Sequence, residues 1–382
     1  MKIQLFIGLL LCACMHVSYV LPLNILFVVD FFPKMTETFI LNQIARLMDS
    51  KKHDIWIHSY NRGKQNESCS VIKDYNLLER TSYGPVYPYD LDEFDILYCQ
   101  FGMVGHKMLQ QKKQQKSNAK LVTCFRGYDI TCQLQKNPRS YTTLLAEGDL
   151  FLPVCECFAQ KLINLGADPH KVIVHHSAID CSMFCYKDRD YSETQPVHMV
   201  SVSRLIEKKG IEDVIRALAL VVKQCKNIHY TIVGDGSLRK NLEKLVHSLG
   251  LQDYVTFLGS ILHERVVSIF ENADLAILPS KKGRGGDQEG IPNVLKEAMA
   301  VGLPVISTYH AGIPELVEHG CSGFLVHEGD IQGLAESILY LVEHPNTRAS
   351  MGVAGREKVE KEFNIDALIP CLEEYFYTLL SK

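Results

Sequence analysis

The sequence carries no large excess of charge of either sign. Its 382 residues include 40 Lys and Arg against 44 Asp and Glu, a formal net charge of -4, and the two signs are mixed along the chain. A protein that binds the phosphate backbone of nucleic acids presents a basic face, which this mixture does not predict. Nucleic acid is therefore not an expected partner, although a few local cations remain compatible with an anionic ligand.

Two phosphate-binding motifs are also missing. No Gly-x-Gly-x-x-Gly follows the first strand expected in either half of the chain, since Gly234-Asp235-Gly236 lacks the third glycine. A Walker-type phosphate loop is absent as well. These absences disfavour a dinucleotide-dependent oxidoreductase and a P-loop kinase.

No pattern in the sequence predicts a metal site. The 13 cysteines are odd in number and irregularly spaced, and Cys99 and Cys124 fall inside expected core strands, which favours buried thiols. Two Asp-x-Asp triplets, at 90–92 and 188–190, are interpreted as loop acids because the first runs into further acidic loop and the second lies in a polar linker. We therefore expect no metal and no organic cofactor.

Residues 1–21 differ from the rest of the chain. Lys2 is followed by an apolar run from Ile3 to Met15, a pattern typical of a signal peptide or a short membrane anchor. The run is marginal in length for a helix that spans a membrane. A cleaved signal, a retained anchor and a start codon placed too far upstream are three alternatives.

The remaining chain is long enough for two domains, and its pattern predicts the same α/β architecture twice. Apolar strands alternate with helical stretches in both halves, beginning at Leu23 in the first and at Val197 in the second. We expect two Rossmann-like doubly wound domains that face a central cleft, at 22–190 and 191–365. A last strand at 171–174 is expected in the first domain, and a C-terminal helix at 366–382 is expected to pack back against that domain.

Two glutamates eight positions apart mark the first candidate site. Glu289 precedes an expected helix of about ten residues in which Pro292 takes the first position, and Glu297 lies ~7 Å further along its axis. Such pairs are most often solvated surface. Here, however, apolar strands at 273–280 and 303–308 enclose the segment in a βαβ unit, whose ligands bind at the carboxyl ends of strands.

A basic turn, residues 203–210, follows the first strand of the second half. Arg204 and Lys209 flank the entry to a helix, where a guanidinium and an ammonium suit a diphosphate. A solvated basic turn is the usual interpretation of such a run. Its pairing with the two glutamates makes a ligand site the better interpretation.

These motifs give the second half a close resemblance to the retaining GT-B glycosyltransferases of family 4, the glycosyl transferases group 1. The resemblance is carried by Arg204 with Lys209, by the Gly234-Asp235-Gly236 run, by the Glu289 and Glu297 pair, and by the Gly-Ile-Pro-Glu run at 312–315. It implies that Arg204 and Lys209 neutralise the donor diphosphate, that Glu289 is catalytic and holds the donor sugar, and that Glu297 holds the ribose. Further donor contacts are expected from N–H groups near Glu289, namely those of Gly290, Ile291 and Asn293.

The first half shows a narrower resemblance, to enzymes of the colanic acid and amylovoran exopolysaccharide class. Its runs at 32–40, 100–102 and 125–129 carry this likeness. Many relatives have a histidine before Gly-x-Asp, whereas this chain has Arg126, which is a charge stabiliser rather than a base near pH 7. We expect Arg126 to be catalytic and Glu37 and Asp129 to contact the acceptor. A helix cap with an acid in its first turn is an equal alternative for Glu37.

The combined pattern predicts a metal-independent enzyme that moves a hexosyl group from a nucleotide sugar to a glycan or lipid-linked saccharide, with retention at the anomeric carbon. Its product would belong to a cell-surface polysaccharide. A nucleotide-sugar epimerase of the same fold and a non-catalytic donor-binding protein are the alternatives. Because the donor is cytosolic in bacteria, we expect the protein in the cytoplasm or on the cytoplasmic face of the membrane, with export left open by residues 1–21.

Overall fold

Two parallel sheets of six strands each organise the chain. The computed structural model describes residues 22–34, 37–63, 70–189, 191 and 196–381. The signal-like segment at 1–21 and Asp190, at the predicted domain boundary, lie outside these ranges. Within them, no helix is both long and apolar enough to cross a membrane.

The first sheet has the strand order β3-β2-β1-β4-β5-β6. Its central strand is an unbroken apolar run in which Ile25 to Val29 are all buried, as expected for a parallel strand covered on both faces. The strands are β1 (Asn24–Phe32), β2 (Asp54–Arg62), β3 (Thr81–Tyr83), β4 (Ile96–Gln100), β5 (Lys120–Phe125) and β6 (Leu150–Pro153). The helices are α1 (Thr38–Asp49), α2 (Ser70–Asp74), η2 (Leu91–Glu93), α3 (Gly102–Gln115), α4 (Cys132–Lys136), α5 (Thr142–Glu147), α6 (Glu156–Asn164) and η3 (Pro169–Lys171).

The second sheet has the order β12-β11-β10-β7-β8-β9. Its strands are β7 (Val197–Val202), β8 (Ile228–Val233), β9 (Val255–Gly259), β10 (Leu275–Ile277), β11 (Val305–Thr308) and β12 (Gly323–Val326). The helices are η4 (Glu207–Lys209), α7 (Ile211–Val221), α8 (Arg239–Ser248), η5 (His263–Arg265), α9 (Val266–Glu271), η6 (Arg284–Gly286), α10 (Asn293–Ala300), α11 (Ile313–Leu316), α12 (Ile331–Glu343), α13 (Pro345–Glu362) and α14 (Ile365–Leu380).

Both sheets show the same reversal of chain order. The first strand of each, β1 or β7, pairs with the fourth, β4 or β10, as well as with the second. In open α/β sheets the loops that follow such a pair of strands diverge and leave a crevice for ligands. In the second sheet these loops are the basic turn after β7 and the segment after β10.

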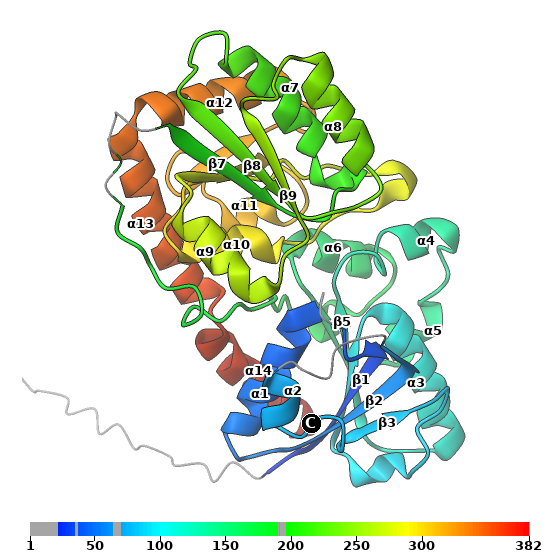
Figure 1. The fold of residues 1–382 in the computed structure, drawn as a ribbon. Coiled ribbons are helices and arrows are strands. Elements are labelled where there is room, and N and C mark those ends of the chain that lie inside the picture. The colour runs from blue at the N-terminus through cyan, green and yellow to red at the C-terminus, as the bar shows by residue number, and fades with distance from the viewer. Residues whose placement is uncertain (1–21, 35–36, 64–69, 190, 192–195, 382) are drawn as a thin grey trace, which may run out of the picture.

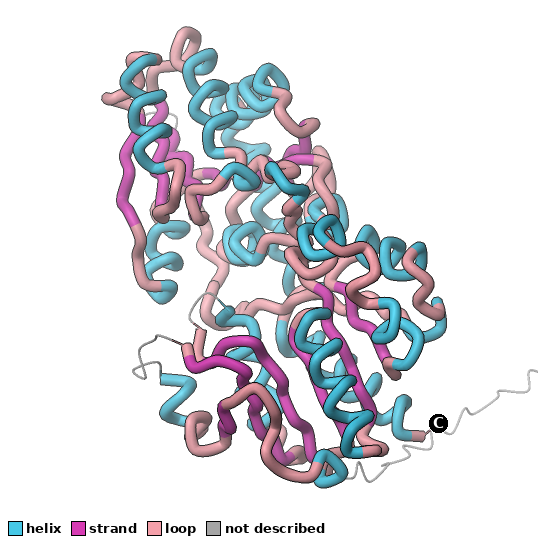
Figure 2. Tube along the Cα trace, turned by 90° about the vertical axis from the view of Figure 1, so that its right-hand side faces the viewer, coloured by secondary structure: helices cyan, strands magenta, loops and turns pink. Residues whose placement is uncertain are grey.

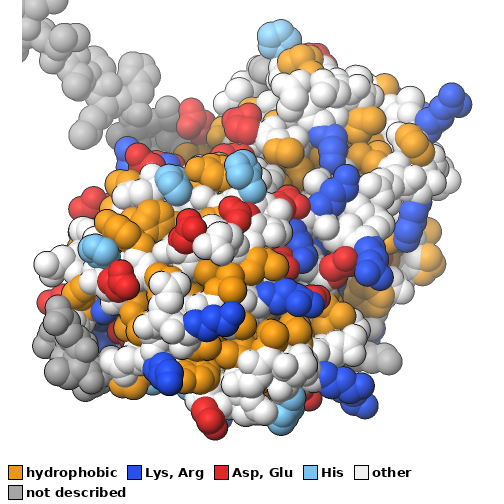
Figure 3. Space-filling model, turned by 90° about the horizontal axis from the view of Figure 1, so that it is seen from above, with side chains coloured by type: hydrophobic (Ala, Val, Ile, Leu, Met, Phe, Trp, Pro, Cys, Tyr) orange, Lys and Arg blue, Asp and Glu red, His pale blue; other side chains and the backbone are white. Residues whose placement is uncertain are grey.

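The predicted architecture of two Rossmann-like sheets is confirmed. Figure 1 shows the two sheets as separate bodies with helices around each, and Figure 2 shows the same separation from the side. On the face seen in Figure 3, acidic and basic side chains are interspersed with apolar ones.

The last helix returns to the first half of the chain. The apolar side chains of α14, among them Leu372 and Phe376, belong to the core cluster that covers one face of the first sheet. Phe376 packs edge-on against Tyr98 of β4 with ring centroids 5.4 Å apart, and Arg46 of α1 lies 2.7 Å from Asp366. Figure 1 shows α14 beside α1, below the second sheet.

One expected strand is absent from the described residues. The sequence predicts a strand at 171–174, but only Val172 forms a bridge, with Phe151 of β6. The chain before it turns instead into η3, because the Asp168 side chain accepts a hydrogen bond from His170 N at 3.0 Å and Pro169 occupies the first turn. The prediction of a strand there was wrong.

Candidate active site

The basic turn is fixed by glycine at its end. Gly210 has φ of 69°, and a β-carbon there would lie 2.0 Å from Pro279 O, so only glycine fits. The preceding turn is η4, which contains Lys208 and Lys209. Lys208 is 8% exposed, whereas Arg204 at the start of the turn is exposed.

The acidic loop, defined as residues 281–292 after β10, meets the basic turn through ion pairs. Glu289 Oε1 lies 3.0 Å from Lys209 Nζ and 3.1 Å from Lys208 Nζ. Lys208 Nζ also lies 3.0 Å from Asp287 Oδ2. The backbone joins the two segments as well, because Lys281 N donates to Lys208 O at 2.9 Å. The structure thus brings the predicted residues Glu289 and Lys209 together at the crevice between β7 and β10.

The charge of Glu289 is held by these lysines. Burial raises the pKa of its carboxyl, but Lys209 and Lys208 outweigh that effect and lower the pKa to about 2. Glu289 is therefore ionised at neutral pH and engaged by two ammonium groups. Such a carboxylate is a hydrogen-bond acceptor and a poor proton acceptor, since its conjugate acid is strong.

Helix α10 begins one residue later than predicted. Pro292 has ψ of 123°, outside the helical region, and is the N-cap; the helix covers eight residues, Asn293–Ala300, instead of about ten from Pro292. Glu297 lies within it and is 7% exposed. Its Oε1 is 3.0 Å from His263 Nε2, and this hydrogen bond raises the pKa of His263.

A buried lysine accompanies Glu297 on α10. Lys296 is 0% exposed, and its Nζ donates to Ser177 O at 2.5 Å and to Asn293 Oδ1 at 3.0 Å. Asn293, predicted as a donor contact, thus has its side-chain oxygen engaged within the helix. Burial and the charge of Arg126 lower the pKa of Lys296 to about 7.

Arg126 lies where the two halves meet. Its Nε and Nη2 both donate to Gln100 Oε1, at 3.2 and 2.6 Å, its Nη1 donates to Ser177 Oγ at 2.6 Å, and its guanidinium covers the Phe39 ring at 4.3 Å. A β-carbon on Gly290 would lie 3.2 Å from Arg126 O. The predicted catalytic arginine is therefore adjacent to the acidic loop, with its guanidinium hydrogen-bonded in the first half.

Asp129, predicted to contact the acceptor, is buried and bound to the backbone of its own half. The side chain is fully buried, and its oxygens accept hydrogen bonds from the backbone N–H groups of Arg126, Gly127 and Gly102 at 3.1, 2.9 and 2.9 Å. Burial raises its pKa, against the effect of these bonds. In this structure the Asp129 carboxylate shapes the loop that carries Arg126.

Two further predicted positions stand apart from this cluster. Glu37 is the N-cap residue of α1 without a capping hydrogen bond from its side chain, and its Oε1 is 2.5 Å from Lys34 Nζ. The Asp-x-Asp pair of the first half is structural: Asp90 accepts from Asp92 N at 2.9 Å, and Asp92 accepts from Ser117 Oγ at 2.7 Å.

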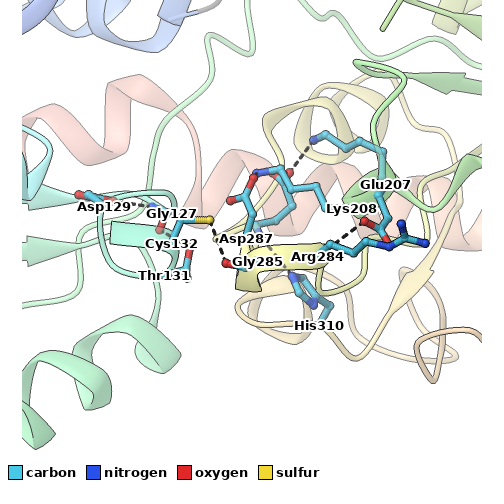
Figure 4. Close-up of polar contacts among 12 residues, drawn as sticks. Gly127, Asp129, Thr131, Cys132, Glu207, Lys208, Arg284, Gly285, Asp287 and His310 are labelled. Atoms are coloured by element: carbon cyan, nitrogen blue, oxygen red, sulfur yellow. Dashed lines mark hydrogen bonds and ion pairs between the residues drawn. The ribbon is translucent and has the colours of Figure 1, made fainter. Parts of the chain in front are cut away.

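The two halves touch through the acidic loop. Figure 4 shows Cys132 and Gly127 of the first half facing Gly285 and Asp287 of the second. Cys132 Sγ donates to Gly285 O at 3.4 Å. Ile291 is buried in an apolar cluster that also contains Cys155 at the start of α6. The acidic loop therefore lies between the two sheets.

Sequence reasoning missed four residues of this cluster: Lys208, Asp287, Lys296 and His310. His310 follows β11, and its Nε2 is 3.1 Å from Glu289 N. Asp287 carried a usable signal, since it lies two positions before Glu289 and alternate residues of an extended segment face the same side. Lys296 offered no such signal, because a lysine beside Glu297 in a helix is ordinarily a surface residue.

The family described as glycosyl transferases group 1 matches residues 187–358. The amylovoran biosynthesis glycosyltransferase AmsK of Erwinia amylovora is 32% identical over 87% of this chain and 94% of its own length. The chain belongs to this glycosyltransferase family. A protein of Salmonella typhimurium named as a colanic acid biosynthesis glycosyltransferase, WcaL, is 31% identical to it over 88% of this chain and 95% of that protein.

The fold of this glycosyltransferase is GT-B, as predicted. Its structure superposes on that of Anabaena HepE in complex with UDP with a TM-score of 0.78, over 93% of this chain and all of the other, at 19% identity. The same Anabaena protein has a structure with UDP-glucose. At this identity the likeness establishes the arrangement of the two sheets.

Proposed function

We propose that this glycosyltransferase moves a hexosyl group from a nucleotide-sugar donor to a saccharide of a cell-surface polysaccharide, with retention at the anomeric carbon. The observation that carries the proposal is the pairing of Glu289 with Lys209 at the crevice of the second sheet. This pair places a carboxylate that can accept hydrogen bonds from sugar hydroxyls in direct contact with a cation that can bind a phosphate. The relatives named for amylovoran and colanic acid biosynthesis support the class of product.

The cations of the basic turn suit a donor diphosphate. Arg204 is exposed at the start of the turn, and Lys209 lies at its end beside Glu289. In the proposed complex both neutralise the diphosphate, and Glu289 accepts hydrogen bonds from the donor sugar. Glu297, held by His263 at 3.0 Å, accepts from the ribose. The distribution of these two anions and two cations along the crevice orients the donor in a single direction.

Transfer then breaks the bond between the anomeric carbon and the phosphate oxygen, and forms the bond to the acceptor oxygen. The proton of the acceptor hydroxyl goes to the departing phosphate oxygen on the same face of the sugar. In this proposal Arg126, whose backbone oxygen lies beside Gly290 of the acidic loop, turns its guanidinium to the departing phosphate and stabilises its negative charge. Arg204, Lys209 and Arg126 supply positive charge for this step, so we propose that it proceeds without a metal.

The acceptor approaches through the first half in this proposal, and a lipid-linked saccharide at the cytoplasmic face of the membrane is the expected substrate class. Glu37, whose carboxylate at the start of α1 pairs with Lys34, is retained as the proposed acceptor contact.

The test is a transfer assay with purified protein, UDP- and GDP-hexoses, and lipid-linked oligosaccharide acceptors, with and without a chelator. We expect one donor to yield an extended glycan at an unchanged rate in the chelator, with the anomeric configuration of the donor retained by NMR. An epimerised nucleotide sugar without transfer would support the epimerase alternative. Donor binding without any turnover would support a non-catalytic protein.

A further inference from the structure

His310 lies immediately behind the acidic loop. It follows β11 and is 1% exposed. Its Nε2 is 3.1 Å from Glu289 N, and its Nδ1 is 2.6 Å from Glu328 Oε1. A backbone N–H only donates and a carboxylate only accepts, so these partners require the neutral ring with its proton on Nδ1. Figure 4 shows the His310 ring beside the acidic loop.

Glu328 holds a second point of the same loop. It follows β12, and its Oε2 accepts a hydrogen bond from Lys282 N at 2.9 Å. Burial raises the pKa of the Glu328 carboxyl, but the hydrogen bonds from Lys282 N and His310 outweigh this and lower it. One ionised carboxylate thus holds the acidic loop at two points. Its Oε2 binds Lys282 N directly, and its Oε1 holds Glu289 N through the ring of His310.

A third contact lies beside these. Gly312 N donates to Gly290 O at 3.2 Å, so two successive residues of the acidic loop are hydrogen-bonded to the segment after β11. The carboxyl ends of β11 and β12 therefore support the loop that follows β10. None of these contacts uses the carboxylate of Glu289, which points to the lysines.

We propose that His310 and Glu328 are a positioning pair that fixes the backbone of Glu289, and thereby sets where its carboxylate meets the donor sugar. The inference rests on the proposed function. Neither side chain touches the donor; both act through the acidic loop. A misplacement of the order of 1 Å at a reacting site costs ~10²-fold in rate, which makes such support consequential.

The structure offers a shape-matched pair of substitutions at position 310. His310→Phe keeps a planar ring in the buried site but removes both ring nitrogens. His310→Gln retains an amide oxygen that can accept from Glu289 N and an amide N–H that can donate to Glu328. The control is His247→Phe, the same change at an exposed position on α8.

The measurements are kcat and KM with UDP-glucose and with GDP-mannose as donors, and the Kd of UDP and GDP. His310→Phe is expected to lower kcat by ~10- to 10²-fold. Nucleotide affinity should stay within about twofold, because the basic turn is untouched by the change. His310→Gln should recover most of the rate, and His247→Phe should match the wild type.

Glu328→Gln gives an independent arm. One of the two carboxylate oxygens becomes an NH₂ group, which then faces a donor at either His310 or Lys282. We expect a loss of kcat similar to that of His310→Phe and a combined effect clearly smaller than the product of the two, because both changes break one chain of contacts. Hydrogen exchange of peptides covering 282–290 should accelerate in both variants without any donor present.

An unchanged kcat in His310→Phe, or unchanged exchange of the acidic loop, would overturn the inference. So would a parallel loss of nucleotide affinity and thermal stability with no recovery in His310→Gln, which would indicate general structural damage. If the wild type neither binds nor turns over any donor, the proposed function fails instead. The exchange measurement still decides whether His310 holds the loop.

Discussion

Replacement of Glu289 by glutamine tests the centre of the site, because it removes the charge and keeps the shape. The amide still accepts a hydrogen bond, but Lys209 loses the carboxylate 3.0 Å away and Lys208 keeps only Asp287. Removing one partner of a buried ion pair costs up to ~3–5 kcal/mol. Since the amide oxygen remains, we expect a smaller loss of stability, of the order of 1–3 kcal/mol.

The kinetic consequence is larger and more specific. Loss of a preorganised group at the reacting centre typically lowers kcat by ~10²–10³-fold. Affinity for UDP or GDP should not fall, because the substitution frees Lys209 of an anion that competes with the phosphates, while Lys208 stays paired with Asp287. Glu289→Gln is therefore expected to separate turnover from nucleotide binding. Glu336→Gln, the same change at an exposed position of α12, is the matched control.

The pH dependence of stability gives the same substitution a second readout. The pKa of Glu289 is lowered from 4.5 to about 2, so its stabilising contribution is complete above pH 4.5 and is lost as the pH falls toward 2. Urea denaturation of the wild type and Glu289→Gln should therefore converge across that window. Transfer at the wild-type rate by Glu289→Gln, or a proportional loss of nucleotide affinity and kcat, would refute the assigned role.

Three further predictions concern the surroundings of the site. Because the pKa of Lys296 is lowered to about 7 in the folded protein, the unfolded state binds more protons than the folded state between pH 7 and 10.5, and the wild type should gain stability across that window. Urea denaturation of Lys296→Met should show no such gain. Arg126→Lys should lower kcat by ~10²-fold with little change in nucleotide affinity in steady-state assays, since one ammonium cannot replace a planar guanidinium that holds Gln100 and Ser177. Gly210→Ala should lower stability in thermal denaturation by at least ~1–3 kcal/mol and weaken UDP binding, because the backbone at φ 69° and the close approach of Pro279 O leave no room for a β-carbon.

The fold was largely predictable, because buried parallel strands are unbroken apolar runs. The first strands of the two halves were expected from Leu23 and Val197, and β1 and β7 begin at Asn24 and Val197. The strand expected at 171–174 failed because its apolar run of three residues, 172–174, also suits an extended loop, and the Asp168 turn decided the outcome.

The site was predictable where charge and strand position coincide. Glu289 and Lys209 follow two strands of one sheet, and the order of strands makes their loops neighbours. For Asp129 the pattern was ambiguous, because a short acid before an apolar residue signals either a ligand contact or a backbone turn, and its complete burial favours the turn. The hydrogen bond between His310 and Glu289 joins residues 21 positions apart, so no local pattern announces it.

The most direct measurement of the central claim is a crystal structure with the non-transferable 2-fluoro analogue of the donor that the transfer assay identifies. The account predicts the diphosphate against Arg204 and Lys209, the sugar hydroxyls against Glu289 and the ribose against Glu297. A nucleotide sugar bound at the first sheet, or with its sugar away from the acidic loop, would contradict it.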